Sequence, residues 1–219
     1  MKQFKAVIFD LDGVITDTAR YHYLAWKRLA EGEGVAFDED FNEHLKGVDR
    51  MGSLELILGE AAPRYSAERK LALADAKNRH YQELIATMSA ADLLPGALEA
   101  LAAVRSAGLR IGLASVSKNA FTVLERLGIR DRFDYVVDAA LIANSKPHPE
   151  IFLTAASHLG VAPRDCLGVE DAVAGVASIK GAGMTALGIG DPDVLTQADR
   201  VIPGLAAFRL DSLQDLHPG

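Results

Sequence analysis

The chain has 219 residues, of which 49% are hydrophobic, and it carries a formal net charge of −7. This length suits one large domain or a core with a smaller insertion, and the hydrophobic content is enough for a substantial core. The negative charge argues against a general binder of nucleic acid or of membrane surfaces, because such proteins are usually basic.

The N-terminal apolar run ends at Asp10 after four residues, which is too short for the core of a signal peptide. No stretch approaches the ~20 apolar residues of a membrane span. The single cysteine, Cys166, excludes an internal disulfide, and its apolar neighbours indicate a small core residue in a reducing compartment. We therefore expect a cytoplasmic protein.

Short apolar runs punctuated by glycine or an acidic residue predict the strands of a sheet. In chain order they are Ala6–Phe9, Leu109–Ala114, Tyr135–Val137, Leu167–Val169 and Thr185–Ile189. The predicted helices between the later runs are Ala97–Ala107, Lys118–Leu127, Glu150–Leu159 and Ala172–Ala182. Several are followed by glycine, the usual residue just past a helix end. This alternation predicts an α/β fold with a Rossmann-like, doubly wound parallel sheet covered on both faces.

The segment between the first two predicted strands has a different character. The patterns there favour helices at Tyr21–Glu31, Met51–Leu58 and Ala67–Met88, with no convincing strand among them. A connection of this length is far too long for a simple crossover, so we expect an inserted all-helical cap domain at 16–89. The core would then consist of residues 1–15 and 90–219. A self-contained core and cap make a monomer the expected state.

Polar side chains follow three of the predicted strands. They are Asp10 and Asp12, then Ser115 and Ser117, then Glu170 and Asp171. Ligands of an open parallel sheet bind beyond the carboxyl ends of its strands, so these groups should meet there. Four converging acids would repel one another unless a hard divalent cation lay among them, and Mg²⁺ suits oxygen ligands of this kind. Lys146, after the third predicted strand, would add positive charge at the same edge.

This collection of groups can carry out phosphoryl transfer. One carboxylate can attack phosphorus and carry it as an aspartyl phosphate, and a second acid can protonate the leaving oxygen. The cation, a lysine and hydroxyl donors would offset the charge of the transferring oxygens. The alternative is that Asp10 and Asp12 only cap a turn, since Asp-Gly is common in loops. The other polar strand ends favour the functional interpretation.

Four ordered motifs cover the chain, namely FDLDGVITDT, LASVSKN, NSKPHPEIF and GVEDAVAG. They resemble the motifs of the haloacid dehalogenase superfamily. The resemblance implies that Asp10 is the nucleophile and Asp12 the general acid and base. It also implies that Ser115 and Lys146 hold the transferring phosphoryl group. The implied Mg²⁺ ligands are Asp10, the Asp12 carbonyl, Glu170 and Asp171.

The inserted segment contains TDTARYHYLAWKRLA, LKGVDR and AKNRHY. With SVSKN these motifs resemble the β-phosphoglucomutase family, which interconverts β-glucose 1-phosphate and glucose 6-phosphate through a bisphosphate. A mutase must also hold the phosphate that is not being transferred, and arginine offers a planar fork of donors for it. The residues expected at this distal phosphate are Arg50, Ser117, Lys118 and Asn119.

The same resemblance assigns roles to further residues of the substrate site. Thr18 lies at the hinge, and His22 and Lys77 couple cap closure to the Asp12 position. Lys46, Gly47 and Val48 touch the sugar. Val116, between Ser115 and Ser117, is also expected in the substrate site. Trp26 is interpreted mainly as a cap core residue, with contact to the sugar as the alternative.

Two other functions remain open at this point. A sugar-phosphate phosphatase would use the same core but let water accept the phosphoryl group. A phospho-receiver module would use the aspartyl phosphate as a signal, but it would not need a large helical insertion with its own cations. The ligands expected from the leading interpretation are small phosphorylated sugars, with the bisphosphate as activator.

Overall fold

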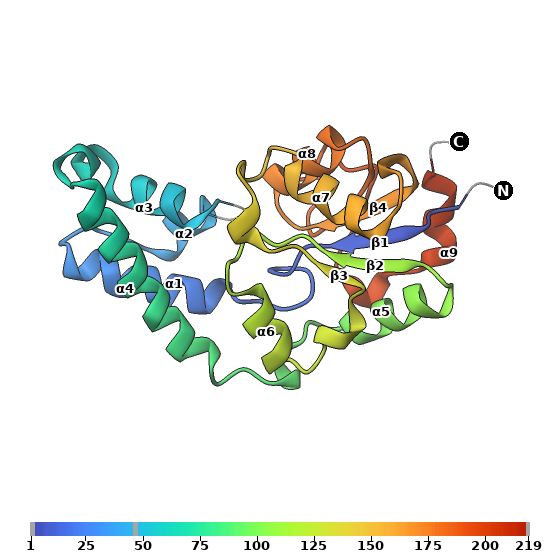
Figure 1. Ribbon diagram of the computed structural model, residues 1–219, viewed down its shortest axis with the longest axis horizontal. Coiled ribbons are helices and arrows are strands. Elements are labelled where there is room, and N and C mark those ends of the chain that lie inside the picture. Colours follow the sequence, from blue (N-terminus) through green and yellow to red (C-terminus); the bar gives the residue numbers. More distant parts are fainter. Residues whose placement is uncertain (1–2, 46–47, 218–219) are drawn as a thin grey trace.

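The computed structural model describes residues 3–45 and 48–217. Its centre is a sheet of six strands in the order β3-β2-β1-β4-β5-β6, and every neighbouring pair is parallel (Figure 1). The strands are β1 (Ala6–Phe9), β2 (Arg110–Leu113), β3 (Tyr135–Val136), β4 (Cys166–Glu170), β5 (Thr185–Ile189) and β6 (Arg200–Ile202). This is the doubly wound α/β architecture that the sequence predicts.

Helices follow the strands or lie between β1 and β2. Those between β1 and β2 are α1 (Ala19–Gly32), α2 (Glu39–Glu43), α3 (Arg50–Leu58), α4 (Ala67–Ile85) and α5 (Ala97–Ser106). The others are α6 (Ala120–Arg126), α7 (Glu150–Leu159), α8 (Val173–Gly181) and α9 (Leu210–Leu213).

Both faces of the sheet are buried, as a parallel sheet requires. Successive side chains of β1 point to opposite faces. Val7 and Phe9 pack in the hydrophobic cluster formed with α5, α6 and α9. Ala6 and Ile8 pack in the opposite cluster, formed with α7 and α8. The strand is therefore apolar along its whole length, and its first polar side chain is Asp10, just beyond its carboxyl end.

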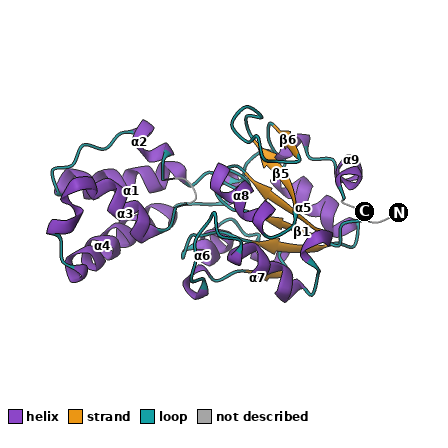
Figure 2. Ribbon diagram, turned by 90° about the horizontal axis from the view of Figure 1, so that it is seen from above, coloured by secondary structure: helices purple, strands orange, loops and turns teal. Residues whose placement is uncertain are grey.

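Helices α1–α4 form a separate lobe beside the sheet (Figures 1 and 2). The lobe has its own apolar core, in which Trp26, Leu54 and Leu73 are buried. Towards its end α4 instead contributes Tyr81 and Ile85 to the cluster that covers the sheet. Because the independent core is confined to this lobe, we propose 16–89 as the limits of the cap domain.

The structure adds three elements that the hydrophobic pattern does not predict. β6 is a three-residue edge strand whose residues are all only partly buried, so it carries no strong apolar signal. α2 has five residues and is capped by Asp38, whose side chain accepts a hydrogen bond from the Phe41 N–H. α9 is shorter still.

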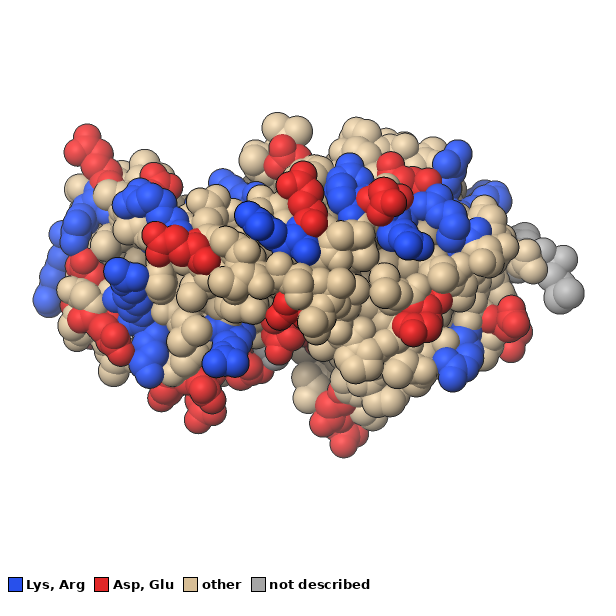
Figure 3. All heavy atoms as spheres, turned by 90° about the horizontal axis from the view of Figure 1, so that it is seen from below, with Lys and Arg blue, Asp and Glu red and all other residues tan. Residues whose placement is uncertain are grey.

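Within the described residues, no helix is long and apolar enough to cross a membrane. On the face shown in Figure 3, acidic and basic side chains are interspersed rather than gathered by sign.

Candidate active site

The candidate site lies where the winding of the sheet reverses. From β1 the chain proceeds through β2 to β3 on one side, and β4 then begins the other half of the sheet. Ligands of doubly wound sheets bind beyond the carboxyl ends of the strands at this switch point. A cavity of about 590 Å³ lies there, lined by the ends of β1, β2 and β4 and by residues of α1, α3 and α4.

Three carboxylates converge in the core wall of this cavity. Asp10, Glu170 and Asp171 can each place an oxygen within 4.8 Å of the others. Burial and the neighbouring Asp10 raise the pKa of the Glu170 carboxyl well above its ordinary value. A cation would offset this repulsion, and carboxylate oxygens are the ligands that hard divalent cations take. The donor set therefore fits a divalent metal.

The Asp12 side chain is not a member of the carboxylate cluster. The Thr18 hydroxyl donates a hydrogen bond to Asp12 Oδ1. Burial, followed by repulsion from Asp10, raises the pKa of Asp12 from 3.8 to about 7. A carboxyl group with such a pKa can hold a proton at neutral pH and also release it, as a general acid and base must. The proposed metal contact of the Asp12 backbone carbonyl stays a prediction.

Gly13 permits the close approach of the β1 and β4 loops. It has φ of +74°, and a Cβ at this position would overlap the Asp171 carboxylate. Any other residue would therefore be strained in its backbone and would also displace an acid of the cluster. The DLDG motif therefore requires glycine at this position for steric reasons.

Lys146 is the buried cation of the core wall. Its ammonium lies 2.6 Å from Asp10 Oδ1 and 2.8 Å from Glu170 Oε2. Burial lowers the pKa of Lys146, but the two carboxylates outweigh this effect and raise it above its ordinary value. The side chain is therefore held charged beside Asp10, where the charge of a phosphoryl group would be placed.

The loop after β2 supplies hydroxyl groups to the same wall. Ser115 is buried, and its Oγ accepts a hydrogen bond from the Ser117 N–H at 3.2 Å. Ser117 Oγ in turn accepts from the Asn119 N–H at 3.3 Å. These bonds turn the chain around the cavity before α6 begins, with exposed Lys118 at the turn.

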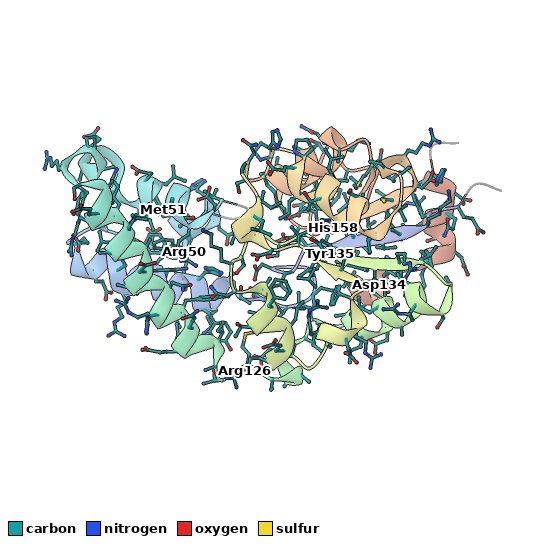
Figure 4. All side chains as sticks on the ribbon, viewed as in Figure 1. Arg50, Met51, Arg126, Asp134, Tyr135 and His158 are labelled. Atoms are coloured by element: carbon teal, nitrogen blue, oxygen red, sulfur yellow. The ribbon has the colours of Figure 1, made fainter. Side chains whose placement is uncertain are left out.

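The cap supplies a second group of basic residues. Arg50 begins α3 on the side of the cap that faces the core (Figure 4). Lys77 is 4% exposed, and its ammonium lies 2.8 Å from His22 Nδ1 and 4.4 Å from the centre of the Trp26 ring. Burial and the charge of Arg50 lower the pKa of Lys77 to about 7. Burial and Lys77 hold the pKa of His22 well below 6.5, so this imidazole is neutral.

The cavity brings most of the sequence-predicted residues together. Those in its lining are Asp10, Asp12, His22, Trp26, Val48, Arg50, Lys77, Ser115, Val116, Ser117, Lys118, Asn119, Lys146, Glu170 and Asp171. Thr18 is fully buried behind the wall and contacts Asp12 instead. Trp26 belongs to the cap core and also lines the cavity. Lys46 and Gly47 lie outside the described residues, so their expected sugar contacts stay predictions.

The cavity also contains polar residues that sequence reasoning missed. Asn42 Oδ1 and Ser145 Oγ are buried in its lining and have no hydrogen-bond partner among the residues that the structure describes. Asn78 lines it as well and bonds to Arg50. Asn42 follows no strand end and Asn78 lies within a charged helix, so spacing alone gives no signal for them. Ser145 directly precedes Lys146 in the NSKPHPEIF motif, and this position could have identified it.

Comparison with known proteins agrees with this geometry. The family model of the haloacid dehalogenase-like hydrolases matches residues 4–183. The chain therefore belongs to this family.

Comparison with individual relatives indicates which group of this family the chain belongs to. The chain is 49% identical to the β-phosphoglucomutase of Bacillus subtilis over 213 residues, which cover 96% of this chain and 94% of the relative. A crystal structure of β-phosphoglucomutase from Clostridium difficile has a TM-score of 0.95 at 45% identity and covers 98% of this chain and 97% of that one. A phosphorylated carbohydrates phosphatase of Thermotoga maritima is 33% identical and covers 82% of each chain. Within the hydrolase family, the chain belongs with the β-phosphoglucomutases.

Proposed function

We propose that this chain is an isomerase that interconverts β-glucose 1-phosphate and glucose 6-phosphate through β-glucose 1,6-bisphosphate and a phosphorylated Asp10. The observation that carries the proposal is a single cavity with groups for phosphate on both sides. The core side has Asp10 and Lys146 in contact, and the cap side has Arg50. The similarity to β-phosphoglucomutases over nearly the whole chain supports it.

The core residues divide the chemistry of transfer. A carboxylate oxygen of Asp10 forms a bond to phosphorus while the bond from phosphorus to the sugar oxygen breaks. Asp12 gives its proton to the leaving sugar oxygen. In the other half-reaction the Asp12 carboxylate takes the proton of the 6-hydroxyl of β-glucose 1-phosphate while the oxygen of that hydroxyl accepts the phosphoryl group from Asp10, which gives β-glucose 1,6-bisphosphate. Transfer of the 1-phosphoryl group of this bisphosphate back to Asp10, as in the first step, releases glucose 6-phosphate. Ser115 and Lys146 bind the phosphoryl oxygens throughout.

Asp10, Glu170 and Asp171 are the proposed side-chain ligands of Mg²⁺, which when bound would neutralise charge on the transferring oxygens. Their clustering supports this assignment.

The cap residues would determine whether a sugar hydroxyl or water accepts the phosphoryl group. Arg50, Ser117, Lys118 and Asn119 are proposed to bind the phosphate that is not transferred, and Lys46, Gly47 and Val48 to touch the sugar. Contact of Arg50 with that phosphate would hold the cap against the core and exclude water, the competing acceptor. Lys77 contacts His22, whose N–H donates to the Thr18 carbonyl, and Asp12 affects the pKa of Lys77. These contacts support coupling between cap closure and the general acid.

A single chain supplies both sides of the cavity, which supports the monomer that we propose. The cytoplasmic location expected from the lone cysteine stays a prediction.

A second function, sugar-phosphate hydrolysis, is favoured by the similarity to the Thermotoga maritima phosphatase. The two are separated by ³¹P NMR of the enzyme with Mg²⁺, β-glucose 1-phosphate and a trace of the bisphosphate. We expect glucose 6-phosphate as the main product. Free phosphate as the main product would replace the mutase by the phosphatase, and no reaction would leave the phospho-receiver function.

A further inference from the structure

A chain of side-chain amides connects the core to the cap beside Arg50. Asn119 precedes α6 in the core, and both ends of its amide bond to α4 of the cap. Its Oδ1 accepts a hydrogen bond from Gln82 Nε2 at 3.1 Å, and its Nδ2 donates to Asn78 Oδ1 at 2.9 Å. Asn78 and Gln82 are four residues apart and therefore lie on the same side of α4.

The Asn78 oxygen receives a second hydrogen bond, from Arg50 Nη2 at 2.8 Å. One neutral acceptor thus gathers a donor from the core, Asn119, and a donor from the cap, Arg50. These are two of the groups proposed to bind the non-transferring phosphate. A phosphate oxygen can accept several N–H bonds at once, and bonds between ionised partners are stronger than those to a neutral amide. A phosphate can therefore replace the Asn78 oxygen at both donors.

We propose that Asn78 is a positioning residue for the distal phosphate, which it serves by holding Arg50 and Asn119 together until the phosphate takes over both donors. The inference rests on the proposed function, because it needs a substrate that carries such a phosphate. It explains why Asn119 does not use its side chain to cap α6, although asparagine is favoured for that task. It also explains how the Arg50 guanidinium finds a hydrogen-bond acceptor in the cavity wall when no phosphate is bound there.

A phosphate can replace the Asn78 oxygen favourably because residue 78 carries a neutral amide and not a carboxylate. An aspartate at this position would keep the shape and both acceptor contacts. It would, however, pair with Arg50 as an ion and repel an incoming phosphate, so that the donors would be released less readily.

The test is a double-mutant cycle of Asn78→Ala and Arg50→Ala. Asn78→Ala should raise the KM for β-glucose 1-phosphate roughly tenfold, as expected when one hydrogen bond to a charged donor is lost. In the Arg50→Ala background the same change should raise KM less than about threefold, since the group being positioned is already missing. Equal effects in both backgrounds would overturn the proposal.

Two further measurements separate positioning from a general structural role. Phosphorylation of Asp10 by acetyl phosphate, which has no distal phosphate, should be nearly unchanged in Asn78→Ala, and a parallel loss there would contradict the inference. The isosteric variant Asn78→Asp should raise KM at least as much as Asn78→Ala, whereas an unchanged KM would also overturn it. Arg79→Ala, an exposed neighbour on α4, is the matched control and should behave as wild type.

Isothermal titration with glucose 6-phosphate tests the role of Asn78 in phosphate binding separately from the proposed isomerase activity. If wild-type enzyme does not isomerise β-glucose 1-phosphate, the proposed function fails. A roughly tenfold weaker affinity of Asn78→Ala for glucose 6-phosphate would still support the positioning role. Equal affinities of variant and wild type would refute it.

Discussion

Asp10 and Asp12 follow the same strand but lie in different surroundings. Asp10 contacts the Lys146 ammonium at 2.6 Å, whereas Asp12 accepts a hydrogen bond from the Thr18 hydroxyl and has a pKa raised to about 7. Two carboxyl groups with different environments can divide the tasks of nucleophile and of acid and base. The division arises from which side chain each one meets, because the two residues are identical and only two positions apart.

Asp10→Asn should abolish turnover, because an amide is a poor nucleophile and a weaker metal ligand than a carboxylate. The fold should survive, since Lys146 keeps Glu170 as a partner at 2.8 Å and one charge of a repelling cluster is removed. Steady-state assays and thermal unfolding of the variant check both parts. Substantial turnover would remove Asp10 from the nucleophile role.

Asp171→Asn should raise the Mg²⁺ concentration needed for half-maximal activity by at least about tenfold, through loss of a charged oxygen ligand. Titration of activity with Mg²⁺ measures the change. Asp193→Asn, at an exposed acid away from the cavity, is the control and should require the wild-type concentration. If the two variants respond alike to Mg²⁺, the acids at the end of β4 are only structural.

At the scale of elements, α4 connects the cap to the reaction site. It carries Lys77 towards His22 and Trp26, and Asn78 and Gln82 towards the core. Lys77 is buried beside the neutral His22 and near Arg50 and Asp12, and its pKa is lowered from 10.5 to about 7. Burial and Arg50 lower this pKa, and Asp12 raises it.

The Lys77 pKa predicts a pH dependence of stability. Between about pH 7 and pH 10.5 the unfolded chain binds a proton at Lys77 that the folded chain does not, so the free energy of unfolding rises with pH in this window. Lys77→Met should remove this contribution. The variant should gain most over wild type below pH 7, and the gain should shrink as the pH rises.

Urea unfolding at pH 6, 7.5 and 9 would measure the difference between Lys77→Met and wild type. Lys5→Met, at an exposed lysine of the core, is the comparison variant and should not show this trend. A difference that stays constant across the three pH values would mean that Lys77 is not desolvated as described.

Sequence reasoning worked for elements whose signal is local. The bounds of β1, β5 and α7 match the predicted runs because those segments are buried or amphipathic along their whole length. It missed β6, which is only half-buried, and α2, which is short.

Residues of the site also divide into those with a local sequence signal and those without one. The core candidates follow strand ends and could be identified from spacing. The contact of Asn78 with Arg50 and Asn119 joins residues 28 and 41 positions apart, and no pattern within either segment encodes it.

At the scale of the molecule, the two lobes divide the work of recognition and chemistry. The sheet places the carboxylates and Lys146 at its switch point, and the cap faces them across the cavity with Arg50 and Lys77. An enzyme that only hydrolysed its substrate would not need to hold a second phosphate while it transfers the first. The groups that we propose for the second phosphate are thus the feature that would connect the architecture with an isomerase.

The fate of the phosphoryl group on Asp10 distinguishes a mutase from a phosphatase. Asp10 is first phosphorylated with acetyl phosphate and Mg²⁺, the donor is removed, and β-glucose 1-phosphate is added with rapid quenching. We expect the phosphoryl group to appear in β-glucose 1,6-bisphosphate and then in glucose 6-phosphate, with free phosphate released more slowly. If the sugar phosphate instead accelerates release of free phosphate and no bisphosphate forms, water is the true acceptor and the mutase function is contradicted.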